Sequence, residues 1–340
     1  MPGRAHSALA ALAALAALVL GGCGSVPLGD PTTALDRVRT LQEQGDTSGV
    51  AKLGGKIAES PEASAADRAE AAFLAGEAEM AEGEEAKAFV RYRYVLENAP
   101  WSTHATAIEG RLFEIGNILL FSDRYSGWFS DRTRGVDALE TLQAHYRSSD
   151  RADDALKLCG DYFAGEDVEE WDEAASHYLR VADEYPESEW AERCLWLAGH
   201  CQLQIAKGPA YDRNELLQAR ATLERSVKTH PRGVAIQEAR ADLTRTQEDL
   251  AACELLAADF YRGRGVEAGE NLRLANAAIL YPETEAGRAA AARLAERGLD
   301  PAALKADPAL NSMDKVKAVR PLWEKDRARD AKKVPYGPPL

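Results

Sequence analysis

The sequence predicts an all-α protein, a solenoid of about five helix pairs that follows an N-terminal export signal. Three observations support this fold class. Apolar residues recur at helical spacing through most of the chain, and helix-ending boundaries return every 39 to 51 residues from position 61 to position 282. No stretch shows the strict polar and apolar alternation of a half-buried strand.

The first 22 residues have the pattern of a secretory signal. Arg4 gives a short positive start, and the run from Ala8 to Leu20 is uncharged. Thirteen residues are too few to cross a bilayer core of about 30 Å as a helix. We therefore expect residues 1–22 to direct export and not to span the membrane.

Cysteine at position 23 gives this signal a more specific meaning. The tetrapeptide Leu20-Gly21-Gly22-Cys23 resembles the lipobox of bacterial lipoproteins. The resemblance implies that the leader is cut before Cys23 and that Cys23 carries the lipid. The alternative is an ordinary secretory signal with an incidental cysteine. Several acyl chains on one residue would anchor the protein without a transmembrane helix.

The residues after Cys23 bear on location. Position 24 is Gly, whereas an Asp there retains such lipoproteins in the inner membrane. The resemblance therefore implies the outer membrane, with the protein on its periplasmic face. We expect residues 23–34 to form a flexible tether to the membrane.

Residues 35–301 are predicted to form the repeat domain. One helix is expected over residues 171–185, before Pro186, because proline ends helices. The following segment carries a second apolar stripe, so the two form a helix pair. The first stripe contains Trp171, Ala174, Ala175, Tyr178, Leu179, Ala182 and Tyr185, and the second contains Ala191, Cys194, Leu195, Ala198, Cys201 and Ile205.

The same unit recurs along the chain. Its boundaries are Pro61, Pro100, Arg147, Pro186, Pro231 and Pro282. Counted back from these positions, a small residue, a large residue and a second small residue recur at fixed steps. This pattern is the second-helix half of the tetratricopeptide signature, although the repeats are longer than that family's regular 34 residues. The pattern is carried by Ala88, Tyr92 and Val95, by Ala174, Tyr178 and Val181, by Ala219, Leu223 and Ser226, and by Leu274 and Ala277.

A lipobox, a tether and about five such pairs resemble the BamD-like family of outer-membrane assembly lipoproteins. Residues 185–299 carry the closest likeness. They contain the inserted loop at 208–219, a helix ending at Pro231, a long helix through Asp249, a short helix with a turn at 263–265, and a helix ending at Pro282. The long segment 121–135 and the tail 302–340 depart from the family pattern.

The resemblance implies a non-catalytic function. Such lipoproteins dock on the central β-barrel assembly subunit and hold segments of unfolded outer-membrane proteins. The alternative is a general envelope scaffold that organises cell-wall or polysaccharide enzymes. Genomic context or co-purification would distinguish the two.

Aromatic residues crowd the segment 121–135, which we expect to be a loop. They could anchor apolar side chains of a bound peptide, or instead fold back as a cap on the solenoid. Two arginines in the segment could meet a chain-terminal carboxylate. These candidate binding residues are Phe121, Tyr125, Trp128, Phe129, Arg132 and Arg134.

The tail 302–340 is expected to be extended or disordered. It holds nine Lys and Arg against five Asp and Glu. Trp323, in the stretch VRPLWEK at 319–325, is a further candidate for contact with a partner. Attraction to anionic lipid or peptidoglycan, or plain disorder, are the alternatives.

Composition and motifs argue against other functions. The chain has 41 Lys and Arg against 55 Asp and Glu, a net charge of −14, which disfavours nucleic acid. The turn at 263–265 is not preceded by a strand, so it does not indicate a dinucleotide loop. We expect no enzyme activity, cofactor, metal or small-molecule substrate.

The cysteines and histidines show no metal-ligand spacing. Cys194 and Cys201 lie seven residues apart on one predicted helix, too far to bridge each other. We expect both to be core residues, and His200 beside Cys201 to serve packing. The sequence leaves open whether Cys159, Cys194, Cys201 or Cys253 forms a disulfide.

Overall fold

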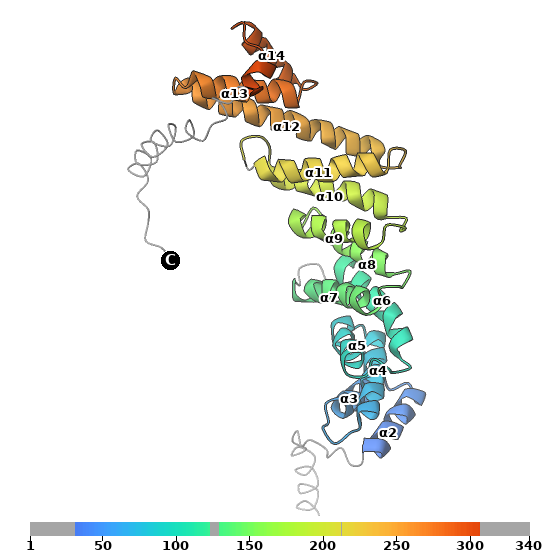
Figure 1. Ribbon diagram of the computed structural model, residues 1–340. Helices are drawn as coiled ribbons and strands as arrows, with labels where there is room; N and C mark the ends of the chain where they lie inside the picture. Colours follow the sequence, from blue (N-terminus) through green and yellow to red (C-terminus); the bar gives the residue numbers. More distant parts are fainter. Residues whose placement is uncertain (1–30, 123–128, 212, 307–340) are drawn as a thin grey trace, which may run out of the picture. The chain divides into compact units, whose positions relative to one another are not determined.

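The structure is a computed structural model, and it describes residues 31–122, 129–211 and 213–306 of the 340-residue chain. Within these residues the chain forms fourteen α-helices and no β-strand (Figure 1). The predicted all-α class is therefore confirmed. The chain divides into two compact units, one up to Tyr146 and the other from Arg147 onward.

Unit 1 contains the first six described helices. Each packs against its neighbour in the sequence, and α2 also contacts α4 while α5 contacts α7. Leu35 and Val38 of α2 are buried in one apolar cluster with Ile57 of α3. The helices are α2 (Pro31–Glu43), α3 (Thr47–Ala58), α4 (Ala65–Ala81), α5 (Glu85–Asn98), α6 (Ala105–Phe121) and α7 (Phe129–His145).

Unit 2 continues the same pairing. Successive helices pack together from α8 to α14, α10 also packs on α12 and α12 on α14, and α15 packs on α13. The helices are α8 (Ala152–Phe163), α9 (Trp171–Glu184), α10 (Ala191–Ala206), α11 (Arg213–Thr229), α12 (Ile236–Gly263), α13 (Glu267–Leu280), α14 (Glu285–Ala295) and α15 (Pro301–Ala306).

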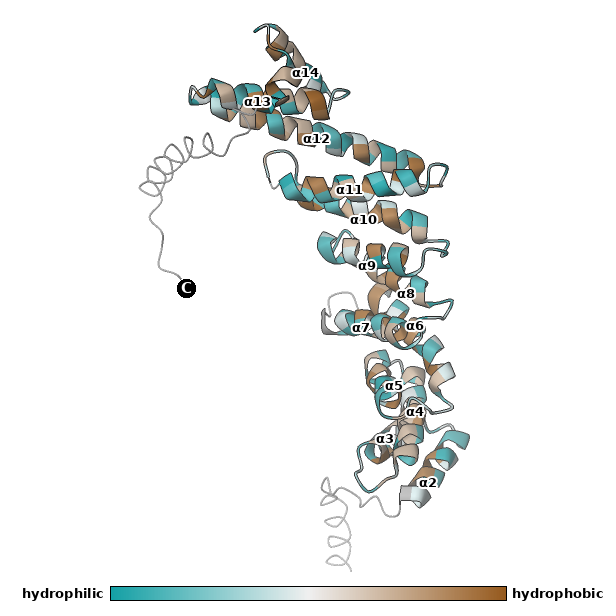
Figure 2. Cartoon of the chain, viewed as in Figure 1, coloured by the Kyte–Doolittle hydropathy of each residue, from teal (hydrophilic) through white to brown (hydrophobic). Residues whose placement is uncertain are grey.

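The tetratricopeptide-like pattern occupies the core positions that the sequence predicts. Every residue of the pattern in α5, α9, α11 and α13 is at most 3% exposed. Each helix carries apolar and polar residues together (Figure 2), so packing in pairs removes the apolar stripes from water. The prediction of a helical-pair solenoid is confirmed.

Glycines on the first helix of a pair make this packing possible. A Cβ at Gly76 would lie 2.8 Å from the ring of Tyr92, one at Gly160 2.6 Å from the ring of Tyr178, and one at Gly199 2.7 Å from Leu223. Ordinary carbon contacts are about 3.5–4.0 Å. The large residues of α5, α9 and α11 therefore fit only because the facing position in each pair has no side chain.

Successive first helices in unit 2 are joined by carboxylates that bind backbone amides. Glu192 of α10 accepts a hydrogen bond from the Ala235 amide at 2.9 Å, at the start of α12. Glu248 of α12 accepts from the amides of Glu285 and Ala286 at 2.7 and 2.8 Å, at the start of α14. These carboxylates satisfy amides that lack partners within their own helix and lie at its positive end.

The structure changes the bounds of several predicted segments. Helix α2 begins at Pro31, inside the predicted tether, α11 begins at Arg213, inside the predicted loop 208–219, and α15 runs to Ala306, past the predicted start of the tail at 302. The long helix does not end near Asp249, because α12 runs unbroken to Gly263. No proline or glycine interrupts residues 236–262, so nothing stops the helix. The segment 121–135 is likewise not all loop, because α6 includes Phe121 and α7 begins at Phe129.

The four cysteines after Cys23 are free thiols. Cys159, Cys194 and Cys201 are buried, and Cys253 is partly buried. Burial raises the pKa of Cys194 and of Cys201 to about 12. Both therefore stay protonated at neutral pH and serve as small core residues, as predicted.

Candidate binding surfaces

The sequence-predicted binding residues fall partly outside the structure. Cys23, Tyr125, Trp128 and Trp323 lie outside the described residues, as does the side chain of Phe129. Phe121 is the last residue of α6 and is 46% exposed. The aromatic group at 121–129 therefore stays a prediction, with Phe121 as its one described side chain.

Arg132 and Arg134 are helical residues of α7. The Arg132 guanidinium donates a hydrogen bond to the carbonyl oxygen of Leu120 at 3.3 Å, at the end of α6. Arg134 pairs with Asp131 at 3.3 Å on its own helix and is 46% exposed. A positive charge at the negative end of α6 is favourable, so Arg132 has a structural contact beside any role in binding.

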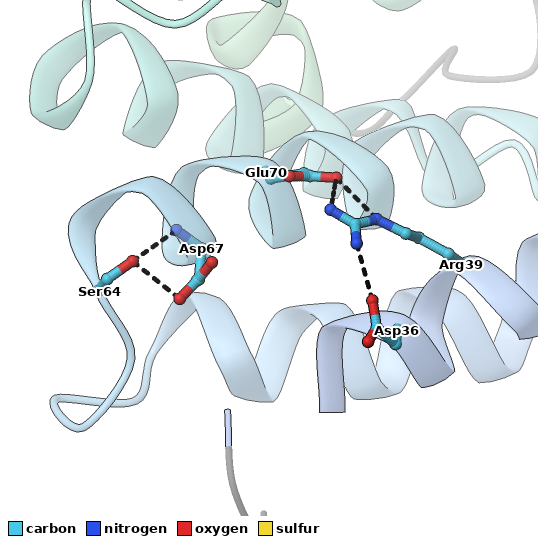
Figure 3. A network of polar contacts seen from close by, with 5 residues as sticks. All are labelled: Asp36, Arg39, Ser64, Asp67 and Glu70. Atoms are coloured by element: carbon cyan, nitrogen blue, oxygen red, sulfur yellow. Dashed lines mark hydrogen bonds and ion pairs between the residues drawn. The ribbon is translucent and has the colours of Figure 1, made fainter. Parts of the chain in front are cut away.

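Ion pairs connect alternate helices in unit 1. Arg39 of α2 donates two hydrogen bonds to one carboxylate oxygen of Glu70 on α4, at 3.0 and 2.7 Å, and a third to Asp36 at 2.8 Å (Figure 3). Beside them, Ser64 caps α4 by accepting from the Asp67 amide at 3.1 Å. These contacts fix the start of the unit and leave Arg39 about half exposed.

A second connection runs from α4 to α6. Both carboxylate oxygens of Glu77 accept from Arg111, at 2.9 and 2.6 Å, and one also accepts from the Tyr92 hydroxyl at 2.5 Å. Burial raises the pKa of Glu77, but the hydrogen bonds from Arg111 and Tyr92 outweigh it and hold the pKa below its usual value. Glu77 is therefore a stable anion that ties three helices together.

In unit 2, a polar cluster joins α10 to α12. Asp242 accepts a hydrogen bond from the Trp196 indole at 2.8 Å and lies 2.9 Å from Nδ1 of His200. Gln204 lies 3.2 Å from Nε2 of His200. Burial raises the pKa of Asp242, yet the His200 and Trp196 hydrogen bonds outweigh it, so this pKa lies below its usual value.

We call Trp196, His200, Gln204 and Asp242 the α10–α12 surface. His200 is 35% exposed and Asp242 16%, and Trp196 and Gln204 are partly exposed. Aromatic and hydrogen-bonding groups side by side on rigid helices can bind a polypeptide. Sequence reasoning missed this surface, although Trp196, His200 and Gln204 recur at four-residue steps opposite the apolar stripe.

A related arrangement occurs at the start of α10. Asp154 of α8 accepts from the Trp190 indole at 2.6 Å, and the Lys157 ammonium lies 4.7 Å from the Trp190 ring centroid. Lys157 also pairs with Asp161 at 2.6 Å. Unit 2 thus presents two tryptophans whose indoles are each held by a carboxylate of another helix.

Within the described residues, no three His, Cys, Asp or Glu side chains are grouped to hold a metal ion. Over the same residues, no helix is long and apolar enough to cross a membrane. His200 binds Asp242, and the Cys201 thiol stays buried and protonated.

The fold and these surfaces define a helical-repeat protein suited to protein–protein contacts. A family model described as outer membrane lipoprotein, YfiO, matches residues 130–305. The chain belongs to this BamD-like family of outer membrane lipoproteins. A search of curated proteins gave no match.

Proposed function

We propose that the protein is a non-catalytic subunit of the machinery that assembles β-barrel proteins in the outer membrane. It is held at the periplasmic face by lipid on Cys23. Its partners are the central barrel subunit and segments of unfolded outer-membrane proteins. Family membership over residues 130–305 is the observation that carries this proposal.

The packing of unit 2 supports a binding role. Stacked helix pairs fix side chains on rigid elements, and extended surfaces of this kind are how repeat proteins bind chains. The α10–α12 surface lies inside the family match and offers an indole, an imidazole, an amide and a carboxylate. Trp196 can contact the side chains of an extended segment, and the polar atoms of Gln204 and Asp242 that are not used within the cluster can pair with its backbone.

The segment 121–135 is a second contact in this proposal. Phe121 is exposed at the end of α6, and Tyr125, Trp128 and Phe129 follow it in sequence. Replacing Trp128 and Phe129 by Ala should weaken capture of unfolded barrel protein without loss of helical circular dichroism. A large loss of helix would show instead that they are core residues.

A general envelope scaffold is the second candidate, because the same fold would also hold cell-wall or polysaccharide enzymes. Depletion of the protein in its own cells distinguishes the two. Our proposal expects folded outer-membrane barrel proteins to fall while inner-membrane proteins remain. Normal barrel levels together with altered cell-wall or polysaccharide synthesis would favour the scaffold.

A further inference from the structure

Helix α12 extends well past the helix beside it. It has 28 residues, against 16 for α10. Glu192 contacts Ala235, and His200 contacts Asp242, so α10 and α12 run parallel. With the same register, the end of α10 at Ala206 lies beside residue 248 of α12. The last turns of α12 therefore extend past the end of α10.

The chain between α10 and α11 crosses α12 just after this point. The carbonyl oxygen of Pro209 accepts from the Cys253 thiol at 3.3 Å, and Arg213 pairs with Glu254 at 2.9 Å. Tyr211, between these two contacts, is 66% exposed. Tyr211 is thus held near the turn of α12 that precedes Leu256.

Two large apolar residues are exposed beyond the crossing. Leu256 is 49% exposed and Phe260 39%, and the guanidinium of Arg264 lies 3.5 Å from the centroid of the Phe260 ring. The exposed part of Phe260 is therefore what this guanidinium leaves uncovered. Phe260 lies 18 residues, or five turns of about 3.6 residues, after Asp242, so it shares the side of α12 that packs on α10. We call Tyr211, Leu256 and Phe260 the α12 end surface.

We propose that this surface binds residues 319–325 of the same chain, the stretch VRPLWEK. Leu322 and Trp323 would cover Leu256 and Phe260. This contact would remove apolar surface from water and would place two aromatic rings, Trp323 and Phe260, against each other. This inference does not depend on the proposed function.

The position of α15 places the tail close to this surface. Leu304 of α15 and Leu255 of α12 pack against the same apolar cluster. Leu256 follows Leu255, so it lies within about one helix diameter, 10–12 Å, of that cluster. The 16 residues from Ala306 to Leu322 can span roughly 50 Å when extended. The tether is therefore long enough, and it keeps the segment at an effective concentration near millimolar.

Charge also favours the tail as the occupant. Residues 302–340 carry nine Lys and Arg against five Asp and Glu, whereas the whole chain has a net charge of −14.

Site-specific photo-cross-linking in the full chain, in its native envelope, tests the proposal. A photoreactive residue at Phe260 should link to a peptide containing Leu322 and Trp323 of the same molecule. The control site is Val234, which is 85% exposed in the same unit and should give no such link. Phe260 is partly exposed, so its replacement should leave helical circular dichroism unchanged.

A tail variant makes the test sharper. Leu322→Ala with Trp323→Ala should reduce the link by about tenfold, the factor that 1.4 kcal/mol gives. Mixed-isotope protein distinguishes a link within one molecule from a link between copies. Links to a second copy, to another protein or to another part of the chain, or no link at all, would each overturn the proposal.

Discussion

Gly76→Ala should destabilise the protein, although alanine is the better helix former. Gly76 lies in the interior of α4, and a Cβ there would be 2.8, 3.1 and 3.2 Å from three carbons of the Tyr92 ring. The Tyr92 side chain is 0% exposed, and Glu77 holds its hydroxyl at 2.5 Å. The ring therefore cannot move aside, and α4 and α5 must separate.

The magnitude follows from two opposing effects. Overpacking of a core costs about 1–3 kcal/mol, and the rigid ring places Gly76 near the upper value. The gain in helix propensity is about 1 kcal/mol. The net loss should be about 2 kcal/mol, which lowers the urea midpoint by about 1 M if the m-value is about 2 kcal/mol/M.

Gly110→Ala is the matched control, because Gly110 lies inside α6 of the same unit and a Cβ there meets nothing within 4 Å. This change should stabilise by up to about 1 kcal/mol. Urea unfolding followed by far-ultraviolet circular dichroism measures both variants. Equal stabilisation by the two would refute the close-packing argument.

Three further predictions concern charges and the anchor. Glu254→Ala should destabilise unit 2 by about 2 kcal/mol, because it leaves the partly exposed Arg213 and Arg273 without their buried partner. Asp183→Ala, in an exposed pair, should change stability by under about 0.5 kcal/mol, and equal effects of the two variants in urea unfolding would contradict this prediction. Burial raises the pKa of Glu79, so the ionised form destabilises the fold as pH rises above the usual glutamate value. Glu79→Gln should therefore raise the urea midpoint of unfolding at pH 7 above that of the wild type. This difference between variant and wild type should shrink below about pH 4, and a difference that does not change with pH would contradict the prediction. Cys23→Ser should move the protein to the soluble fraction on cell fractionation, and an unchanged membrane fraction would exclude the lipid anchor.

Local patterns predicted the helices and their core residues well. The small and large residues at Ala174, Tyr178 and Val181 are buried because a helix pair must remove one apolar stripe from water. Proline marks the boundaries because it cannot continue a helix. Both effects are local in sequence, so a single sequence is enough to predict them.

Contacts between distant residues were beyond such reasoning. Asp242 meets Trp196 and His200 across more than 40 residues, and their distance depends on how two repeats stack. Arg132 shows the same limit, because its contact with Leu120 arises only when α6 and α7 are placed together. Composition indicated a loop around Gly135, yet this glycine lies inside α7, where a Cβ would be 2.9 Å from Leu120.

The most direct test of the proposed function is a mild-detergent pull-down of the tagged, full-length protein from its native envelope, read by mass spectrometry. The proposed function predicts recovery of the β-barrel assembly subunit in near-equal amounts. Its absence, with cell-wall or polysaccharide enzymes recovered instead, would contradict that function.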